Sequence, residues 1–122
     1  GAINGLVVMA RAHIRLGDDG VARDELREAA ALARQTHDEL RQAQVHLAAG
    51  DRHRSAGAHR EAVGSFCAAL GAARNSGALL EQSRAHRCLS EVYEFLGDHV
   101  SALRHAQRAD AVDGQLGSPA GS

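Results

Sequence analysis

Three glycines that follow apolar or small residues are spaced at equal intervals along the chain. They are Gly17, Gly57 and Gly97, and the intervals are 57 − 17 = 40 and 97 − 57 = 40 residues. Self-similarity at a fixed period of this length is typical of repeat architectures. Each glycine ends an apolar segment, where a helix commonly needs a residue in the left-handed conformation. The chain is therefore predicted to contain three copies of one supersecondary unit.

Other positions agree when the sequence is aligned on this period, and most of them hold small or apolar residues. Small side chains let two helix backbones approach closely, and a larger residue fills the adjacent gap. Identity between the copies is otherwise low, as expected when packing alone preserves the pattern. The columns that agree are Ala22, Ala62 and Ala102; Ala29, Ala69 and Ala109; Leu26, Phe66 and Ala106; His13, His53 and Tyr93; and Ala10, Gly50 and Ser90.

Each period has room for two helices. Alanine is the best helix former, and Pro119, which is the only proline, lies near the end of the chain. Aromatic residues make up 2% of the sequence, so the core must consist mainly of Ala, Leu and Val. Helical steps of three and four between apolar residues support both helices of the period. The predicted helices are 2–16, 39–56 and 79–96 as the first of each pair, and 20–35, 59–74 and 99–114 as the second.

The stretch from Ala85 to Ala109, AHRCLSEVYEFLGDHVSALRHAQRA, resembles a tetratricopeptide repeat. The matching positions are specific to the family when taken together, although none of them is specific alone, and they span nearly the whole chain. The third copy carries it at Leu89, Ser90, Tyr93, Gly97, Asp98, Ala102, Ala106 and Ala109. The second matches at Gly50, Gly57, Ala62, Phe66 and Ala69, and the first at Met9, Ala10, Gly17, Ala22, Leu26 and Ala29.

The chain also departs from the family pattern. The tryptophan column holds Leu6, His46 and His86, and the terminal proline column holds Arg34, Arg74 and Gly114. The period is 40 residues, whereas the family's is about 34. The longer unit is similar to the repeats of large bacterial regulators, including actinobacterial antibiotic-pathway regulators and LuxR-type ATPases. The resemblance implies an all-α superhelical solenoid of three helix-turn-helix repeats, acting as a protein-interaction module of such a regulator. A reducing cytoplasm is the expected location by default.

The predicted domain spans residues 1–116, with repeats of about 1–37, 38–77 and 78–116, and residues 117–122 are predicted to be a disordered tail. The columns shared by the copies are expected to form the packing between repeats. The packing residues are Gly17, Ala22, Ala29, Gly57, Ala62, Phe66, Ala69, Leu89, Tyr93, Gly97, Ala102 and Ala109.

In tetratricopeptide folds the first helix of each pair lines a concave groove, and this resemblance predicts a partner-binding surface here. It mixes arginines, carboxylates and apolar side chains, which suits an extended peptide or a helix of mixed charge. For any single residue, an ordinary solvated surface is an equally good interpretation. The predicted groove residues are Asn4, Val8, Arg11, Arg15, Gln44, Leu47, Asp51, Arg54, Arg84, Arg87, Glu91 and Glu94.

The family's chaperone-binding members hold a terminal carboxylate in a clamp of basic and Asn side chains. Arg84 fits one clamp position, but Val7, Ala48 and Cys88 occupy others and cannot donate the hydrogen bonds. Recognition of chaperone tails is therefore not expected.

The ends of the repeat array suggest a second function. Terminal repeats normally need polar outer faces. Here the chain begins in an apolar segment that contains Val8 and Met9, and it ends on one that contains Val100, Leu103 and Leu116. We expect one or both ends to be covered, either by further repeats or by self-association. A structural module that dimerises through uncapped terminal helices is therefore the alternative to a peptide-binding scaffold.

Other kinds of function find little support. The sequence has no nucleophile elbow, phosphate-binding glycine loop or HExxH motif, so neither an enzyme nor a cofactor is expected. The eight histidines include no pair at i, i+4 spacing, and no metal site is predicted. The net charge of −1 gives no general attraction to nucleic acid. The basic cluster of Arg52, Arg54 and Arg60 is interpreted as a solvated turn, because no aromatic stacking residues accompany it.

Two further expectations concern the environment of the chain. No apolar run approaches the ~20 residues that a membrane-spanning helix needs. Cys67 and Cys88 both lie in apolar helical patterns and are predicted to be buried free thiols rather than a disulfide or a metal site.

Overall fold

The computed structural model describes residues 1–117, which form six α-helices and no strand. The remaining five residues, 118–122, hold Pro119 and most of the predicted tail, and they lie outside the described residues. The helices are α1 (Ala2–Leu16), α2 (Asp19–Gln35), α3 (Glu39–Ser55), α4 (His59–Ser76), α5 (Leu79–Leu96) and α6 (His99–Gly117). The predicted all-α class and the three helix pairs are confirmed. Because α6 includes Gly117, the folded part extends one residue beyond the predicted boundary at 116.

The glycines that set the period close the first helix of each pair. Gly17, Gly57 and Gly97 have φ angles of 84°, 79° and 86°, a region that L side chains rarely adopt. After the first of them, the Asp18 amide donates to the His13 carbonyl at 2.8 Å, which satisfies one carbonyl at the helix end. The same bond recurs after the other two glycines. The turn chemistry expected from the spacing is therefore present in all three repeats.

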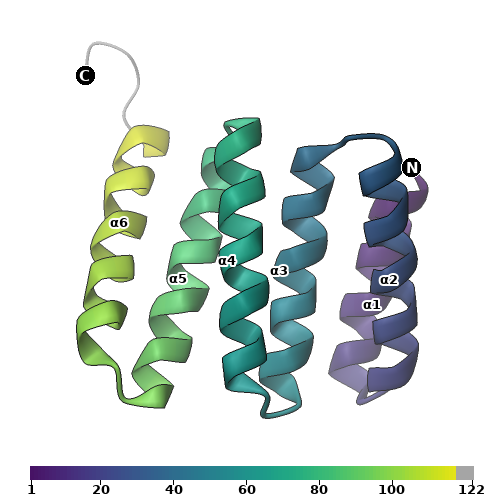
Figure 1. Ribbon diagram of the computed structural model, residues 1–122, viewed down its shortest axis with the longest axis horizontal. Coiled ribbons are helices and arrows are strands. Elements are labelled where there is room, and N and C mark those ends of the chain that lie inside the picture. Colours follow the sequence, from purple (N-terminus) through teal and green to yellow (C-terminus); the bar gives the residue numbers. More distant parts are fainter. Residues whose placement is uncertain (118–122) are drawn as a thin grey trace.

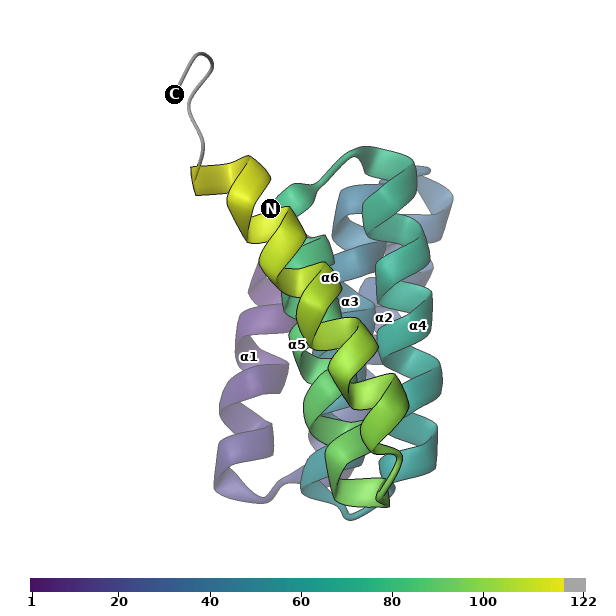
Figure 2. The ribbon, with the colours of Figure 1, turned by 90° about the vertical axis from the view of Figure 1, so that its left-hand side faces the viewer.

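The helices stack side by side in chain order (Figure 1). Each helix packs against its neighbours in sequence, and in addition α1 contacts α3 and α3 contacts α5. Figure 2 shows α1 and α5 toward one side of the stack, α2 and α4 toward the other, and α6 leaning across the end. This arrangement is the helical solenoid that the sequence predicts, with the first helices of the three pairs forming one continuous face.

Small side chains fill the space between the helices. The predicted packing alanines are 0–2% exposed, Phe66 and Leu89 are fully buried, and Tyr93 is partly buried against the same core. One apolar cluster, around Leu26 and Val45, joins the first repeat to α3. A second cluster, around Phe66, Leu89 and Val92, joins the second repeat to the third. The core is therefore a series of inter-repeat layers rather than one central cluster, as expected for a solenoid.

The column that holds His13, His53 and Tyr93 supplies contacts between the two helices of a pair. In the first repeat His13 Nδ1 lies 2.6 Å from Oε1 of Glu25, which is 9% exposed. In the third repeat the corresponding positions hold Tyr93 and His105, whose rings stack with centroids 5.7 Å apart. These positions therefore join the helices of a pair by polar or aromatic contacts.

The third repeat departs from the other two where α5 meets the last turns of α6. Both Ser83 and Arg87 donate to the Asp113 carboxylate, and Arg87 also donates to Asp110 at 3.2 Å. We call these four residues the closing cluster. Their counterparts are apolar in the earlier repeats: Ile3 and Ala43, Val7 and Leu47, Ala30 and Leu70, and Ala33 and Ala73. The last turns of α6 therefore carry carboxylates at positions that are apolar in α2 and α4, whereas Val100 and Leu103 near its start are exposed apolar residues.

The two cysteines do not share an environment. Cys88 is partly buried, but Cys67 is exposed, so the prediction of burial is wrong for Cys67. Its counterparts in the other repeats are Arg27 and Gln107, which are both exposed on the outer side of their helices. Cys67 fits the spacing of three and four residues between the apolar positions of α4. Its exposed counterparts nevertheless show that this position faces solvent in every repeat.

Candidate partner-binding face

The side formed by α1, α3 and α5 contains two neighbouring depressions, and seven of the twelve predicted groove residues line them. We call this surface the groove face. One depression, of about 280 Å³, joins all three helices, and the other, of about 250 Å³, lies between α1 and α3. The predicted residues that line them are Arg11, Arg15, Leu47, Asp51, Arg54, Arg84 and Arg87.

A chain of ion pairs crosses the groove face from α1 to α5. Arg11 donates to Asp51 at 2.6 Å, Asp51 also accepts from Arg54 at 3.2 Å, and Arg54 donates to Glu91 at 2.8 Å. These side chains are partly exposed, so each pair contributes about 0.2–1 kcal/mol. The ion pairs thus link three successive first helices across the face.

The larger depression has an apolar floor and a cationic rim. Leu47, which is 4% exposed, and Cys88 form the floor, and Arg11, Arg84 and Arg87 stand around it. Burial raises the pKa of the Cys88 thiol to about 11, so the thiol is neutral and behaves as a small apolar group. This depression can accept an apolar side chain whose neighbours carry negative charge.

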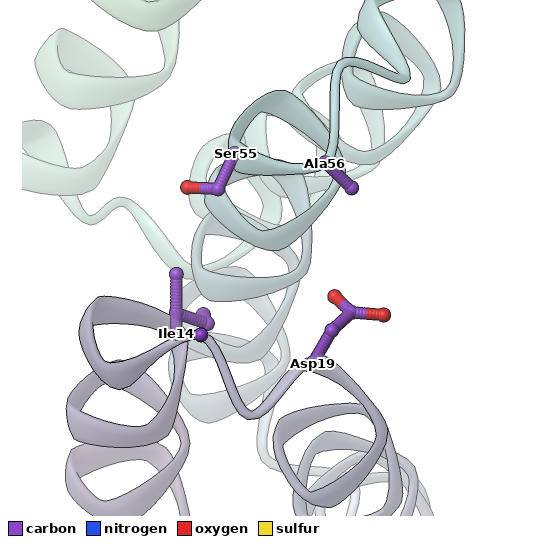
Figure 3. Close-up of a pocket in the computed structure, with 5 residues that line it drawn as sticks. Ile14, Asp19, Ser55 and Ala56 are labelled. Carbon is purple, nitrogen blue, oxygen red and sulfur yellow. The ribbon is translucent and has the colours of Figure 1, made fainter.

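The smaller depression continues toward the turn of the first repeat. Ile14 and Ser55 line both this depression and an adjoining one of about 240 Å³. Figure 3 shows Ile14 and Asp19 from the first repeat facing Ser55 and Ala56 at the end of α3. The Asp19 carboxylate accepts from Arg52 at 3.0 Å across the repeat boundary. The adjoining depression is therefore bounded by an inter-repeat ion pair.

Positive charge is in excess in the two depressions of the groove face. Arginine supplies five of the lining residues and Asp51 is the one acid, although the whole chain has a net charge of −1. Within residues 1–117, neither Arg15 nor Arg84 has a carboxylate oxygen within 4.0 Å. The face therefore presents guanidinium groups that are available to an anionic partner.

The other five predicted groove residues lie outside these depressions. Gln44 donates to the buried Glu81 at 3.3 Å, and Glu94 lies 2.6 Å from His99 at the start of α6. Asn4 lines a separate depression near the turn between α2 and α3, and Val8 is 67% exposed. Glu91 borders the face through its ion pair with Arg54.

Three lining residues were not among the predicted groove residues, namely Ile14, Ser55 and Cys88. All three could have been found from the period alone. Cys88 shares its column with Val8, Ser55 shares its column with Arg15, and Ile14 shares its column with Arg54. Applying each predicted position to all three repeats would have included them.

Other kinds of site are not formed by the described residues. No group of three or more His, Cys, Asp or Glu side chains in residues 1–117 is placed to hold a metal ion. The only cysteines, at positions 67 and 88, are free. None of the six described helices is both long and apolar enough to cross a membrane.

Comparison with known proteins identifies the fold. No protein-family model and no curated protein sequence matches the chain. Among solved structures, the crystal structure of the TPR domain of FLU from Arabidopsis superimposes with a TM-score of 0.78. The match covers 97% of both chains at 18% sequence identity. The chain therefore has the fold of a tetratricopeptide-repeat domain.

Proposed function

We propose that this chain is a protein-interaction scaffold that binds an extended segment of a partner protein along the groove face. The observation that carries the proposal is the pair of adjoining depressions that runs across the first helices. Solenoids commonly use such extended surfaces for binding, because each repeat adds a strip of side chains to one face. No catalytic group or cofactor is part of the proposal.

The lining of the face specifies the chemistry of the partner segment. An apolar side chain fits the floor formed by Leu47 and Cys88, and carboxylates complement Arg15 and Arg84. Guanidinium groups bind carboxylates with two parallel hydrogen bonds where the geometry allows. The preferred segment is therefore extended and contains an apolar residue flanked by Asp or Glu.

The test is an unbiased selection followed by charge reversal. Random twelve-residue peptides displayed on phage are selected against the domain, and a selected peptide is synthesised for calorimetric titration. Arg84→Glu and Arg15→Glu are each expected to weaken binding by about tenfold or more, since loss of a charged contact costs about 1.5–3 kcal/mol. Arg27→Glu is the matched control, because Arg27 is exposed on α2 and lines none of the depressions of the groove face.

Arg87 is a poorer choice for charge reversal than Arg84. Its guanidinium is bound by Asp110 and Asp113, so a glutamate there would disturb the contact between α5 and α6 as well as the groove face. Failure to select any peptide, or binding that is equally weakened by Arg27→Glu, would contradict the proposal.

The wider context is a second part of the proposal. We propose that the domain belongs to a cytoplasmic bacterial regulatory protein, which is supported by the 40-residue period and its similarity to the long repeats of such regulators. The complete gene is then expected to encode a DNA-binding, nucleotide-binding or cyclase domain beside this one. A gene that encodes none of them would contradict this part and leave peptide binding intact.

Self-association through terminal helices is the alternative function. It is favoured by apolar side chains at the C-terminal end, where Phe95, Val100 and Leu103 are 60–71% exposed. Sedimentation velocity between about 10 and 300 μM tests it. A dimer that Leu103→Glu dissociates would support pairing of these ends, and a monomer at every concentration would exclude it.

A further inference from the structure

The two internal junctions of the stack use the same four positions of the period. At each junction a first helix receives the second helix of the preceding repeat. The side-chain amides of Gln42 and Gln82 donate to the Ala33 and Ala73 carbonyls at 3.3 and 3.4 Å, and neighbouring apolar residues fill the core layers. The receiving residues are Gln42, Val45, Ala49 and Arg52 on α3, and Gln82, Ala85, Leu89 and Val92 on α5.

The same positions on α1 form a surface that nothing covers within residues 1–117. They hold Ala2, Gly5, Met9 and Ala12, which we call the N-terminal face, and all four are exposed. Met9 is 50% exposed, whereas its counterpart Leu89 is fully buried. No residue of this face carries a side-chain charge, and three are small enough for close approach of a helix backbone. The N-terminal face thus continues the pattern of the two internal junctions.

The opposite end of the stack does not continue the pattern. The positions on α4 that α5 covers hold Val63, Phe66, Leu70 and Ala73, and their counterparts on α6 are Leu103, Ala106, Asp110 and Asp113. Leu70 and Ala73 are 7% and 0% exposed. A repeat added on α6 in the same register would therefore desolvate both carboxylates of the closing cluster. Removing ionised groups from water is costly even when they are paired.

We infer that the stack accepts a further helical hairpin at its N-terminal face only. The fitting partner is a hairpin whose second helix presents small and apolar residues in the pattern of α2 and α4. A second copy of this chain does not supply such a helix through α6. In the register of the internal junctions, Asp113 would lie where Ala33 and Ala73 lie, opposite Ala2 of the other copy, which offers no hydrogen bond or countercharge.

The experiment compares the same hairpin added at either end of the full chain. A copy of residues 38–80 placed directly before Gly1 keeps the register, because Gly1 is equivalent to Glu81. A copy of residues 38–77 placed directly after Gly117 keeps it at the other end, because Gly117 is equivalent to Gly77. The N-terminal addition is expected to raise Tm by about 5 °C or more, and the C-terminal addition is expected to leave it unchanged or lower it.

Two variants separate the inference from simple failure of the added segments to fold. In the C-terminal addition, four substitutions replace the closing cluster with the residues of the second repeat and should produce a rise in Tm. They are Ser83→Ala, Arg87→Leu, Asp110→Leu and Asp113→Ala. In the N-terminal addition, Met9→Glu should abolish the rise. An unsubstituted C-terminal addition that stabilises as much as the N-terminal one overturns the inference. An N-terminal addition that leaves Tm unchanged also overturns it.

Discussion

Gly50 on α3 lies directly against the ring of Phe66 on α4. A Cβ atom at position 50 would come within 2.6 Å of Cδ1 and 2.7 Å of Cζ of that ring, closer than real Cβ contacts allow. Gly50→Ala is therefore expected to destabilise the fold by about 1–3 kcal/mol through overpacking. Helix propensity alone would raise the free energy of unfolding by about 1 kcal/mol. A decrease measured by chemical denaturation would therefore identify the packing effect.

The first repeat suggests how the cost at Gly50 can be relieved. There the same two columns hold Ala10 and Leu26, which are both buried in one cluster. Adding Phe66→Leu to Gly50→Ala reproduces this pair, and the double variant should be more stable than the sum of the two single changes predicts. Gly64→Ala is the control, because nothing lies within 4 Å of a Cβ there and a gain of about 0.5–1 kcal/mol is expected. A loss in the control would point to a general effect of glycine replacement.

The ion-pair chain of the groove face gives a second prediction. Asp51 accepts from both Arg11 and Arg54, so Asp51→Asn should lower the free energy of unfolding by about 0.5–1.5 kcal/mol at low salt. The difference between the variant and the original protein should shrink in 1 M NaCl, since salt screens partly exposed charges. Asp24→Asn is the control, because Asp24 is exposed and its one ion pair among residues 1–117, with Arg23, has an N–O distance of 3.5 Å. If both substitutions lowered the free energy of unfolding equally, the ion-pair chain at Asp51 would contribute no more than an ordinary surface pair.

The pair formed by the buried His86 on α5 and the partly buried His105 on α6 gives a third prediction. His86 Nδ1 lies 2.9 Å from His105 Nδ1, and His86 is 2% exposed. Burial, together with the nearby positive charge of His105, Arg74 and Arg108, lowers the pKa of His86 from 6.5 to about 4. The unfolded chain therefore binds a proton at a higher pH than the folded chain. Stability should fall as the pH drops from about 6.5 toward 4, by an amount on the order of 2 kcal/mol.

The measurement is urea denaturation at pH 7.0, 5.5 and 4.5 of the original protein and of His86→Leu. Leucine is the residue at the corresponding position of the first repeat, Leu6, so the replacement fits the fold. Burial also lowers the pKa of His46 and His53, so part of the pH dependence should remain. A variant whose stability falls with pH as steeply as that of the original protein would show that His86 is not responsible.

Cysteine reactivity gives a fourth prediction. Cys67 is exposed on α4, whereas Cys88 is partly buried in the groove face. Burial raises the pKa of both thiols, and that of Cys88 to about 11. Because the thiolate is the reactive form, a maleimide reagent should modify Cys67 faster than Cys88, by at least about tenfold at pH 7.5. Mass spectrometry of peptides from a timed reaction measures both rates. Faster modification of Cys88 would show that the floor of the larger depression is open to solvent.

Much of the fold could be predicted from the sequence because the repeat is encoded by local chemistry. A glycine such as Gly57 marks a helix end by its own backbone freedom, and alanines such as Ala62 mark close helix contacts by their size. The period then assigns each position a place in the stack without knowledge of distant contacts. The helix pairs, their order and the small-residue core therefore follow from spacing and residue type alone.

The binding face was only partly predictable for the same physical reason. The family resemblance, carried over by register, assigned Arg11, Arg54 and Arg87 to one surface, but it did not indicate which carboxylate each of them meets. Their partners on other helices lie 23 to 40 residues away in the sequence, and these contacts depend on how neighbouring helices pack. The tertiary structure alone therefore decided that Arg87 is held by α6, whereas Arg84 is free of carboxylate partners within residues 1–117.

The sequence by itself determined a solenoid of three helix pairs, because backbone conformation and side-chain size act over a few residues and repeat with the period. Only the tertiary structure decided how the ends of that solenoid differ. Asp110 and Asp113 are ordinary acids in the sequence, and they become a closing cluster only because α6 packs against Arg87 and Ser83. Charge pairing depends on three-dimensional proximity, which a period of residue types does not encode.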